Sequence, residues 1–141
     1  MLTSTRVPAL VASLLAVALS GCETQTDVTR TDALQGRSLF VSQCAACHGD
    51  DGRGAGPASL GLGAPPPSLT SLSQRNGGVF PRDYVITVID GFDPQNHPTS
   101  AMPEFGAEDM GPLVQVESDG ISTPVPADLL ALATYLETIQ D

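Results

Sequence analysis

The arrangement of apolar and polar residues predicts a helix near each end of the main body of the chain. The first helix is expected to begin at Thr31 or Asp32, which are good caps, and to run past Phe40. The last helix is expected over residues 128–140, where apolar side chains recur at helical spacing. These positions are Leu129, Leu132, Leu136 and Ile139, with Tyr135 beside them. Each segment by itself predicts an amphipathic helix with one face in a core.

Glycine and proline divide the middle of the chain. Residues 49–57 contain too many glycines for a helix, and residues 60–78 are interrupted by prolines and a glycine pair, so both predict loops. Residues 82–90 carry a β-branched run that favours a strand by propensity, yet their apolar positions also suit one face of a helix. Pro81 and Gly91 stand where such a helix would start and stop.

The segment just before the last helix has the pattern of two short strands. Residues 113–117 and 121–125 alternate in polarity around a Ser-Asp-Gly turn, which predicts a β-hairpin. Such a hairpin could dock a partner, although a simple elaboration of a loop is the more general expectation.

The first residues have the features of an export signal. Arg6 is followed by an apolar stretch over residues 9–19, which is too short to cross a bilayer comfortably. The sequence Leu-Ser-Gly-Cys that ends at Cys22 resembles a bacterial lipobox, and this resemblance implies cleavage before Cys22 and a lipid on it. We therefore expect a membrane-anchored lipoprotein on the periplasmic side of the inner or outer membrane. Its expected divisions are a signal peptide (1–21), a flexible tether after the lipidated Cys22 (22–32) and one domain (33–141).

The charge of the chain is strongly negative and its basic residues are all arginines. There are 16 Asp and Glu residues against 6 arginines and no lysine, a net charge of −10, and loss of Arg6 with the signal peptide makes it −11. Such a surface argues against nucleic acid and favours partner proteins with a basic docking surface, although acidity can serve solubility alone. The acidic residues expected near such a partner are Asp50, Asp51, Glu104, Glu108 and Asp109.

Two cysteines and a histidine form the most informative motif in the chain. Cys44 and Cys47 are three residues apart, and His48 follows directly. On one turn of helix, thiols at this spacing share a face, so each can add to a different vinyl group of one porphyrin. His48 can then reach the iron as proximal ligand while its other ring nitrogen donates a hydrogen bond. The motif therefore predicts one covalent haem c.

The same three residues also fit a redox-active cysteine pair, half of a zinc site or a chance pentapeptide. A zinc site would need further Cys or His ligands at short spacing, and the chain offers only Cys22 and His97. With Cys22 assigned to lipid and the other two cysteines to haem, none is left for a disulfide.

Residues 31–141 resemble class I cytochromes c through the attachment motif, the two end helices and a Met-Pro pair downstream. The resemblance implies a small all-α cytochrome c fold in which the N- and C-terminal helices cross. It also implies a helix over residues 82–90, and it makes the hairpin near 113–125 an insertion. The residues that match the family's helix crossing are Gly36, Phe40, Leu132 and Tyr135.

The same resemblance implies roles for two residues beyond the motif. The carbonyl of Pro57 is expected to accept the ring N–H of His48, and Met102, just before a proline, is expected to be the distal iron ligand. A thioether ligand raises the reduction potential, whereas a second histidine would lower it. The competing ligands within the chain are Met110 and His97.

The function that the resemblance implies is that of a one-electron carrier and not of an enzyme. If His48 and Met102 fill both axial positions, the iron has no open site for peroxide, oxygen or nitric oxide, and no small-molecule substrate is expected. Two alternatives stay open. One is a haem-bearing subunit of a larger oxidoreductase, and the other is a haem enzyme or gas sensor, which would require that Met102 does not bind.

Overall fold

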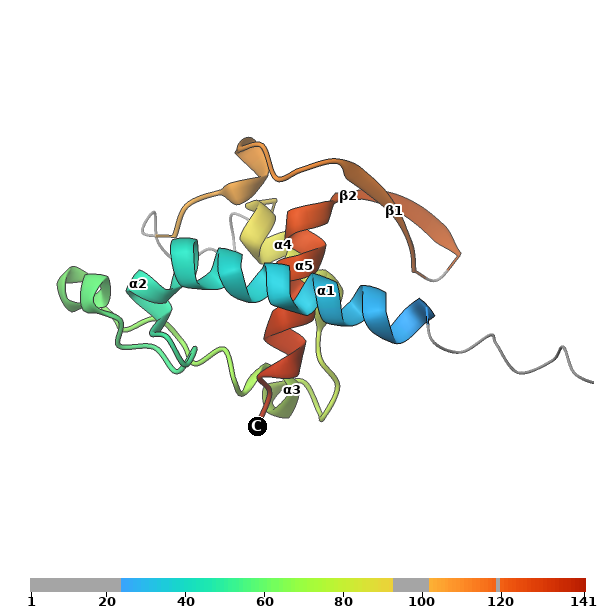
Figure 1. Ribbon diagram of the computed structural model, residues 1–141. Helices are drawn as coiled ribbons and strands as arrows, with labels where there is room; N and C mark the ends of the chain where they lie inside the picture. Colours follow the sequence, from blue (N-terminus) through green and yellow to red (C-terminus); the bar gives the residue numbers. More distant parts are fainter. Residues whose placement is uncertain (1–23, 93–101, 119) are drawn as a thin grey trace, which may run out of the picture.

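The computed structural model describes residues 24–92, 102–118 and 120–141, which form short helices and one β-hairpin around a common core (Figure 1). The expected signal peptide, Cys22 and His97 lie outside the described residues. Two 3₁₀ turns (η2, η3) and one π turn (η1) join the α-helices of the described ranges. The elements are α1 (Thr24–Leu39), η1 (Phe40–Cys44), α2 (Ala45–His48), η2 (Pro57–Gly61), α3 (Leu72–Arg75), α4 (Arg82–Asp90), η3 (Phe105–Ala107), β1 (Leu113–Ser118), β2 (Ile121–Pro126) and α5 (Ala127–Thr138).

The centre of the molecule is the crossing of α1 and α5, which Figure 1 shows running across each other. A Cβ atom on Gly36 would overlap the backbone carbonyl of Ala131 and lie 2.8 Å from Cβ of Tyr135, so only glycine permits this approach. One turn further on, the rings of Phe40 and Tyr135 meet with their centroids 5.3 Å apart. Leu132 is 1% exposed in the same core. The crossing that the resemblance implied is present in the structure.

Helix α1 begins earlier than the sequence pattern predicted. Its first residue is Thr24, whereas the cap was expected at Thr31 or Asp32 and the preceding residues were expected to form a flexible tether. Low hydrophobicity suggested the tether, but no glycine or proline interrupts residues 24–35, so nothing in the backbone ends the helix there. The expected start of the helix is therefore corrected, while a tethering role for this segment stays a prediction.

Residues 82–90 form the helix α4, not the strand that their β-branched residues favour by propensity. Val85 and Ile89, four residues apart, are buried, and α4 packs against α5. The helix ends at Gly91, whose φ of 94° lies in the left-handed region that favours glycine. Burial of one helical face therefore outweighs the local strand preference.

The predicted hairpin is confirmed. Strands β1 and β2 pair antiparallel in a register that sets Leu113 opposite Pro126 and Ser118 opposite Ile121. Val125 is buried at the base of the hairpin beside α5, whereas Leu113 and Ile121 are exposed. None of the helices within the described residues is long and apolar enough to cross a membrane.

Candidate haem-attachment site

The attachment motif begins in an irregular turn after α1. Phe40 lies in the core and opens the π turn η1, and Cys44 ends it with a φ of −113° before the single α-helical turn α2. A π turn rotates the residues beyond it relative to the preceding helix, so α2 does not continue the face of α1. No feature of the sequence predicted this turn.

The two cysteines and the histidine lie in residues 44–48, which we call the motif turn and which consist of the end of η1 and the helical turn α2. On an ideal α-helix this spacing would place the three side chains within an arc of about 100°. Both cysteines are half-buried and neither forms a disulfide. Within the described residues, no group of three or more His, Cys, Asp or Glu side chains is arranged to hold a metal ion.

Burial sets the protonation of these groups. Burial, and after it the nearby Cys47, raises the pKa of the Cys44 thiol to about 11. Burial lowers the pKa of His48 from its ordinary value of 6.5, and a hydrogen bond with the backbone of Pro67 opposes that change. At neutral pH, Cys44 is therefore a thiol and His48 a neutral imidazole, which is the form that ligates iron.

One nitrogen of the His48 ring has no partner among the described residues. Nδ1 is buried and makes no hydrogen bond there, while the ring interacts with the backbone of Pro67. A buried polar atom without a partner is costly, so Nδ1 is open to a hydrogen bond or a ligand that the described residues do not supply. The expected acceptor was Pro57, which lies exposed at the start of η2. Its role is not confirmed and stays a prediction.

Residues 49–57, which we call the glycine loop, fold back over the end of α2. The N–H groups of Gly54 and Gly56 donate to the carbonyls of His48 (2.7 Å) and Cys47 (3.0 Å), which satisfies the open end of the motif turn. A Cβ atom on Gly56 would lie 2.6 Å from the carbonyl oxygen of Ala45. The loop therefore needs glycine where its backbone lies on the backbone of the motif.

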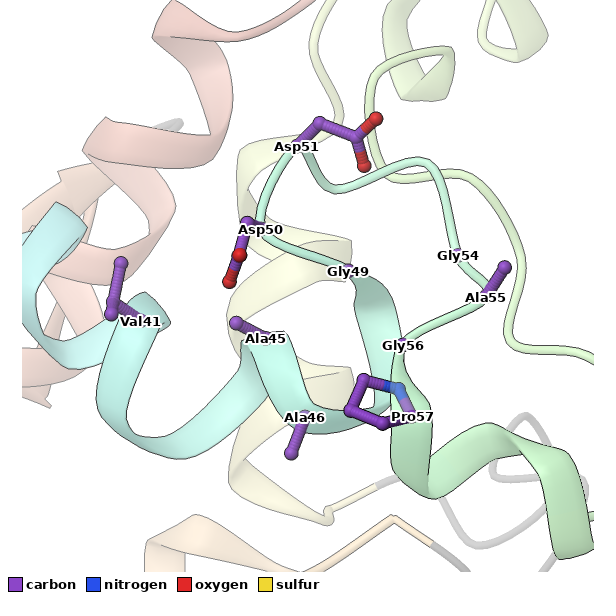
Figure 2. A pocket seen from close by; sticks show the side chains of 10 residues that line it. All are labelled: Val41, Ala45, Ala46, Gly49, Asp50, Asp51, Gly54, Ala55, Gly56 and Pro57. Carbon is purple, nitrogen blue, oxygen red and sulfur yellow. The ribbon is translucent and has the colours of Figure 1, made fainter.

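An open hollow of about 740 Å³ lies beside the motif turn on its alanine side (Figure 2). Small apolar residues make up most of its wall, and Asp50 and Asp51 are its charged members. Neither thiol nor His48 lines it. The side chains expected to bind haem therefore do not form the wall of this hollow.

Comparison with known families decides the class of the protein. A family model described as cytochrome c oxidase, cbb3-type, subunit III matches residues 31–113, more than half of the chain. The chain belongs to this family. The matched residues contain the whole attachment motif and the glycine loop, so the protein is a c-type cytochrome, as the resemblance predicted. No curated protein and no solved structure matches the chain.

Membership has direct consequences for cofactor and role. The family implies a haem c cofactor and a part in electron transfer. The two free thiols and the neutral imidazole of His48 fit such a group. The mostly helical fold with its small two-stranded sheet is compatible with a small cytochrome c fold.

The two candidate methionines of this cytochrome differ in their surroundings. Met110 is 4% exposed in the core, and its carbonyl accepts the N–H of Asp128. Met102 is partly buried and packs against the edge of the same core. Both methionines therefore have apolar neighbours, and Met102 is the less buried of the two. Ligation by Met102 stays a prediction.

The expected acidic residues are all exposed, namely Asp50, Asp51, Glu104, Glu108 and Asp109. Pro67 was not anticipated as a neighbour of His48, although the run of three prolines at 65–67 marked a stiff segment.

Proposed function

We propose that this cytochrome passes single electrons through one covalent haem c. Cys44 and Cys47 hold the porphyrin, and His48 and Met102 are the axial ligands of its iron. The observation that carries the proposal is the motif turn, where two free, half-buried thiols stand three residues apart and a neutral imidazole follows directly. When bound, the haem supplies an iron that changes its charge by one electron.

The protein's own part is to hold the iron still and to keep water away from it. Burial keeps His48 neutral, so its ring is available as a ligand at neutral pH. The glycine loop fixes the backbone of Cys47 and His48 through two hydrogen bonds. A thioether from Met102 would favour ferrous iron and raise the reduction potential.

Covalent attachment is tested by staining for haem after denaturing electrophoresis and by extraction with acid acetone. We expect haem to stay on the native polypeptide and to be lost from the Cys44→Ser/Cys47→Ser variant. Release of haem from the native sequence would overturn this part of the proposal.

The distal ligand is tested with Met102→Ala, and Met110→Ala is the matched control. The first variant should lose the methionine-to-ferric-iron charge-transfer band and bind carbon monoxide readily when reduced. Met110→Ala should keep the band, since Met110 fills the core. The reverse result would transfer the ligand role to Met110. If the wild-type protein itself lacks the band, the distal ligand is not a methionine.

The family match favours a second candidate, in which the cytochrome is a subunit of a terminal oxidase complex. A subunit should stay bound to the other oxidase subunits when the membrane is gently solubilised, whereas a free carrier should not. The test is therefore gentle solubilisation followed by size separation and haem staining. Haem c that migrates with oxidase activity supports the subunit. Haem c that migrates alone at the size of one chain supports the carrier.

We further propose that lipid on Cys22 tethers the protein on the exported side of a membrane. The lipobox-like sequence before Cys22 supports this, and members of such families are typically exported or membrane-associated. One acyl chain binds a bilayer only marginally, whereas several hold firmly. Cys22→Ser should therefore release the protein or leave it unprocessed. Mature wild-type protein in the soluble fraction would contradict the tether.

The partner is proposed to carry basic residues around its own redox centre. The chain has no lysine, and Asp50 and Asp51 line an open hollow next to the motif. Opposite charges steer encounters, and salt screens them over about 8–10 Å at ordinary ionic strength. Stopped-flow electron transfer should slow with salt for a basic partner and quicken for an acidic one. Rates indifferent to salt with both would limit the acidity to a role in solubility.

A further inference from the structure

Residues 140 and 141 are joined by hydrogen bonds to two loops near the motif. The Asp141 carboxylate accepts from both terminal nitrogens of Arg53 (2.5 and 3.1 Å) and from the hydroxyl of Thr70 (2.8 Å). The N–H of Asp141 donates to the Thr70 carbonyl (2.8 Å), and the side-chain amide of Gln140 donates to the Leu69 carbonyl (2.8 Å). We call Arg53, Thr70, Gln140 and Asp141 the C-terminal clamp.

The clamp connects to the glycine loop by two routes, and the first of them continues to the backbone of His48. Arg53 lies in the glycine loop directly before Gly54, whose N–H donates to the His48 carbonyl (2.7 Å). On the second route, the N–H of Leu69 donates to the carbonyl of Gly52 in the same loop (2.7 Å). Both routes end in short hydrogen bonds between backbone groups. A displacement of Asp141 therefore reaches the loop that holds the proximal histidine.

The exposure of its members indicates what the clamp is for. The Arg53 and Asp141 side chains are 56% and 50% exposed, and an exposed ion pair adds little to stability. Thr70, in contrast, is 3% exposed, and its hydroxyl shares the Asp141 carboxylate with Arg53. A planar guanidinium that holds a carboxylate with two bonds fixes direction as well as distance. The arrangement is suited to position a loop more than to store free energy of folding.

We propose that the C-terminal clamp positions the proximal side of the haem site, holding the glycine loop and through it the orientation of the His48 ring. The proposal rests on the function as a haem c carrier. The orientation and hydrogen bonding of an iron ligand tune the potential of the metal. The clamp thus makes the residues that follow α5 part of the control of the reduction potential.

The test compares holoprotein variants that each remove one partner of the ion pair. In Asp141→Asn and in Arg53→Gln, the midpoint potential should shift and the NMR resonances of the His48 ring should move in the ferric protein. Hydrogen exchange at the Gly54 N–H should become roughly tenfold faster, as expected when about one net hydrogen bond no longer holds the loop. Asp141→Glu, which keeps the carboxylate, should restore part of each change. Arg53→Gln keeps the test valid if Asp141→Asn fails to fold.

The control is the pair of Arg82 and Glu137, which joins α4 to α5 and, like the clamp, pairs a guanidinium with an exposed carboxylate. Glu137→Gln makes the same change of charge near the same end of the chain's last helix without touching the glycine loop. It should leave the His48 resonances and the exchange of Gly54 unchanged. Equal effects of Glu137→Gln and Asp141→Asn would overturn the proposal, as would His48 resonances that neither Asp141→Asn nor Arg53→Gln moves. Haem attachment is scored on the same samples, so a failure of the carrier function is seen separately.

Discussion

The α1–α5 crossing and the glycine loop are both places where two segments approach closely, and they are built in opposite ways. At the crossing, one glycine, Gly36, admits the neighbouring helix, and large side chains such as Phe40 and Leu132 fill the surrounding space. In the loop, backbone lies directly on backbone, and Gly54 and Gly56 donate hydrogen bonds to the motif turn. Buried apolar area stabilises the first region, and hydrogen bonds stabilise the second.

This difference means that the two regions respond to different changes. A buried large apolar side chain contributes about 1.5–3 kcal/mol, and a typical hydrogen bond contributes about 1 kcal/mol net. Mutations at the crossing should therefore act mainly on the free energy of unfolding. Mutations in the loop should act mainly on the motif and its haem.

The largest effect is expected from Gly36→Val. Any Cβ atom at Gly36 overlaps the carbonyl of Ala131, so the helices must separate and expose the core. We expect a loss of about 3 kcal/mol or more in the free energy of unfolding, measured with urea on the holoprotein. Gly61→Val is the control, because nothing lies within 4 Å of a Cβ there. Equal losses in the two variants would show that the close approach at Gly36 is not what matters.

Gly56→Ala should have a smaller effect on stability and a larger one on the haem. Its Cβ would lie 2.6 Å from the Ala45 carbonyl oxygen, so the loop must move off the motif turn. We expect a loss of about 2 kcal/mol, and a lower fraction of chains with attached haem, read from the ratio of haem to protein absorbance. Gly63→Ala, with nothing within 4 Å, should attach haem normally. Normal attachment in Gly56→Ala would contradict the assigned role of the loop.

The ring contact at the crossing should be measurable as a coupling energy. Phe40 and Tyr135 lie 5.3 Å apart between centroids, in a tilted arrangement. A double-mutant cycle with Phe40→Leu and Tyr135→Leu should give a coupling of about 1 kcal/mol. A control cycle combines Phe40→Leu with Thr138→Ala, at the exposed end of α5. This second cycle should give no coupling energy. Additive losses in the first cycle would show that the two rings do not stabilise each other.

The smallest effect is expected at acid pH, from Asp141 in the clamp. Hydrogen bonds from Arg53 and Thr70 hold the pKa of this carboxyl below its ordinary value of 3.8. A lowered folded-state pKa stabilises the fold above the ordinary value, and this contribution disappears as the pH falls through the folded-state pKa. The gap in unfolding free energy between wild type and Asp141→Asn should thus be constant from neutral pH to near 3.8 and then close. A gap that persists at lower pH would contradict the pKa assignment.

Sequence reasoning predicted the parts of the fold that depend on side-chain pattern. The apolar spacing at Leu129, Leu132 and Leu136 predicted α5, and the alternation around the Ser-Asp-Gly turn predicted the hairpin. Both patterns reflect which side chains face the core and which face water, and this pattern can be read directly from the sequence. Residues 82–90 show the limit, because their local propensity favours a strand and only packing against α5 selects the helix.

The features that sequence did not predict depend on backbone geometry and on distant neighbours. No residue type in the sequence marks the π turn at 40–44. The start of α1 at Thr24 follows from the absence of a helix breaker and not from a cap. At the site, spacing identified Cys44, Cys47 and His48, but the interaction of His48 with Pro67 joins residues that the sequence separates by a loop. The clamp was missed for the same reason.

The position of the α1–α5 crossing has a consequence for the order of events during synthesis. The contact of Gly36 with Ala131 joins the two ends of the domain, so the core cannot close until residues 127–138 have left the ribosome. Closing so long a loop is slow compared with forming local turns. Until α5 is present, Cys44 and Cys47 therefore lie just beyond a helix whose partner is missing, and they are open to the machinery that attaches haem.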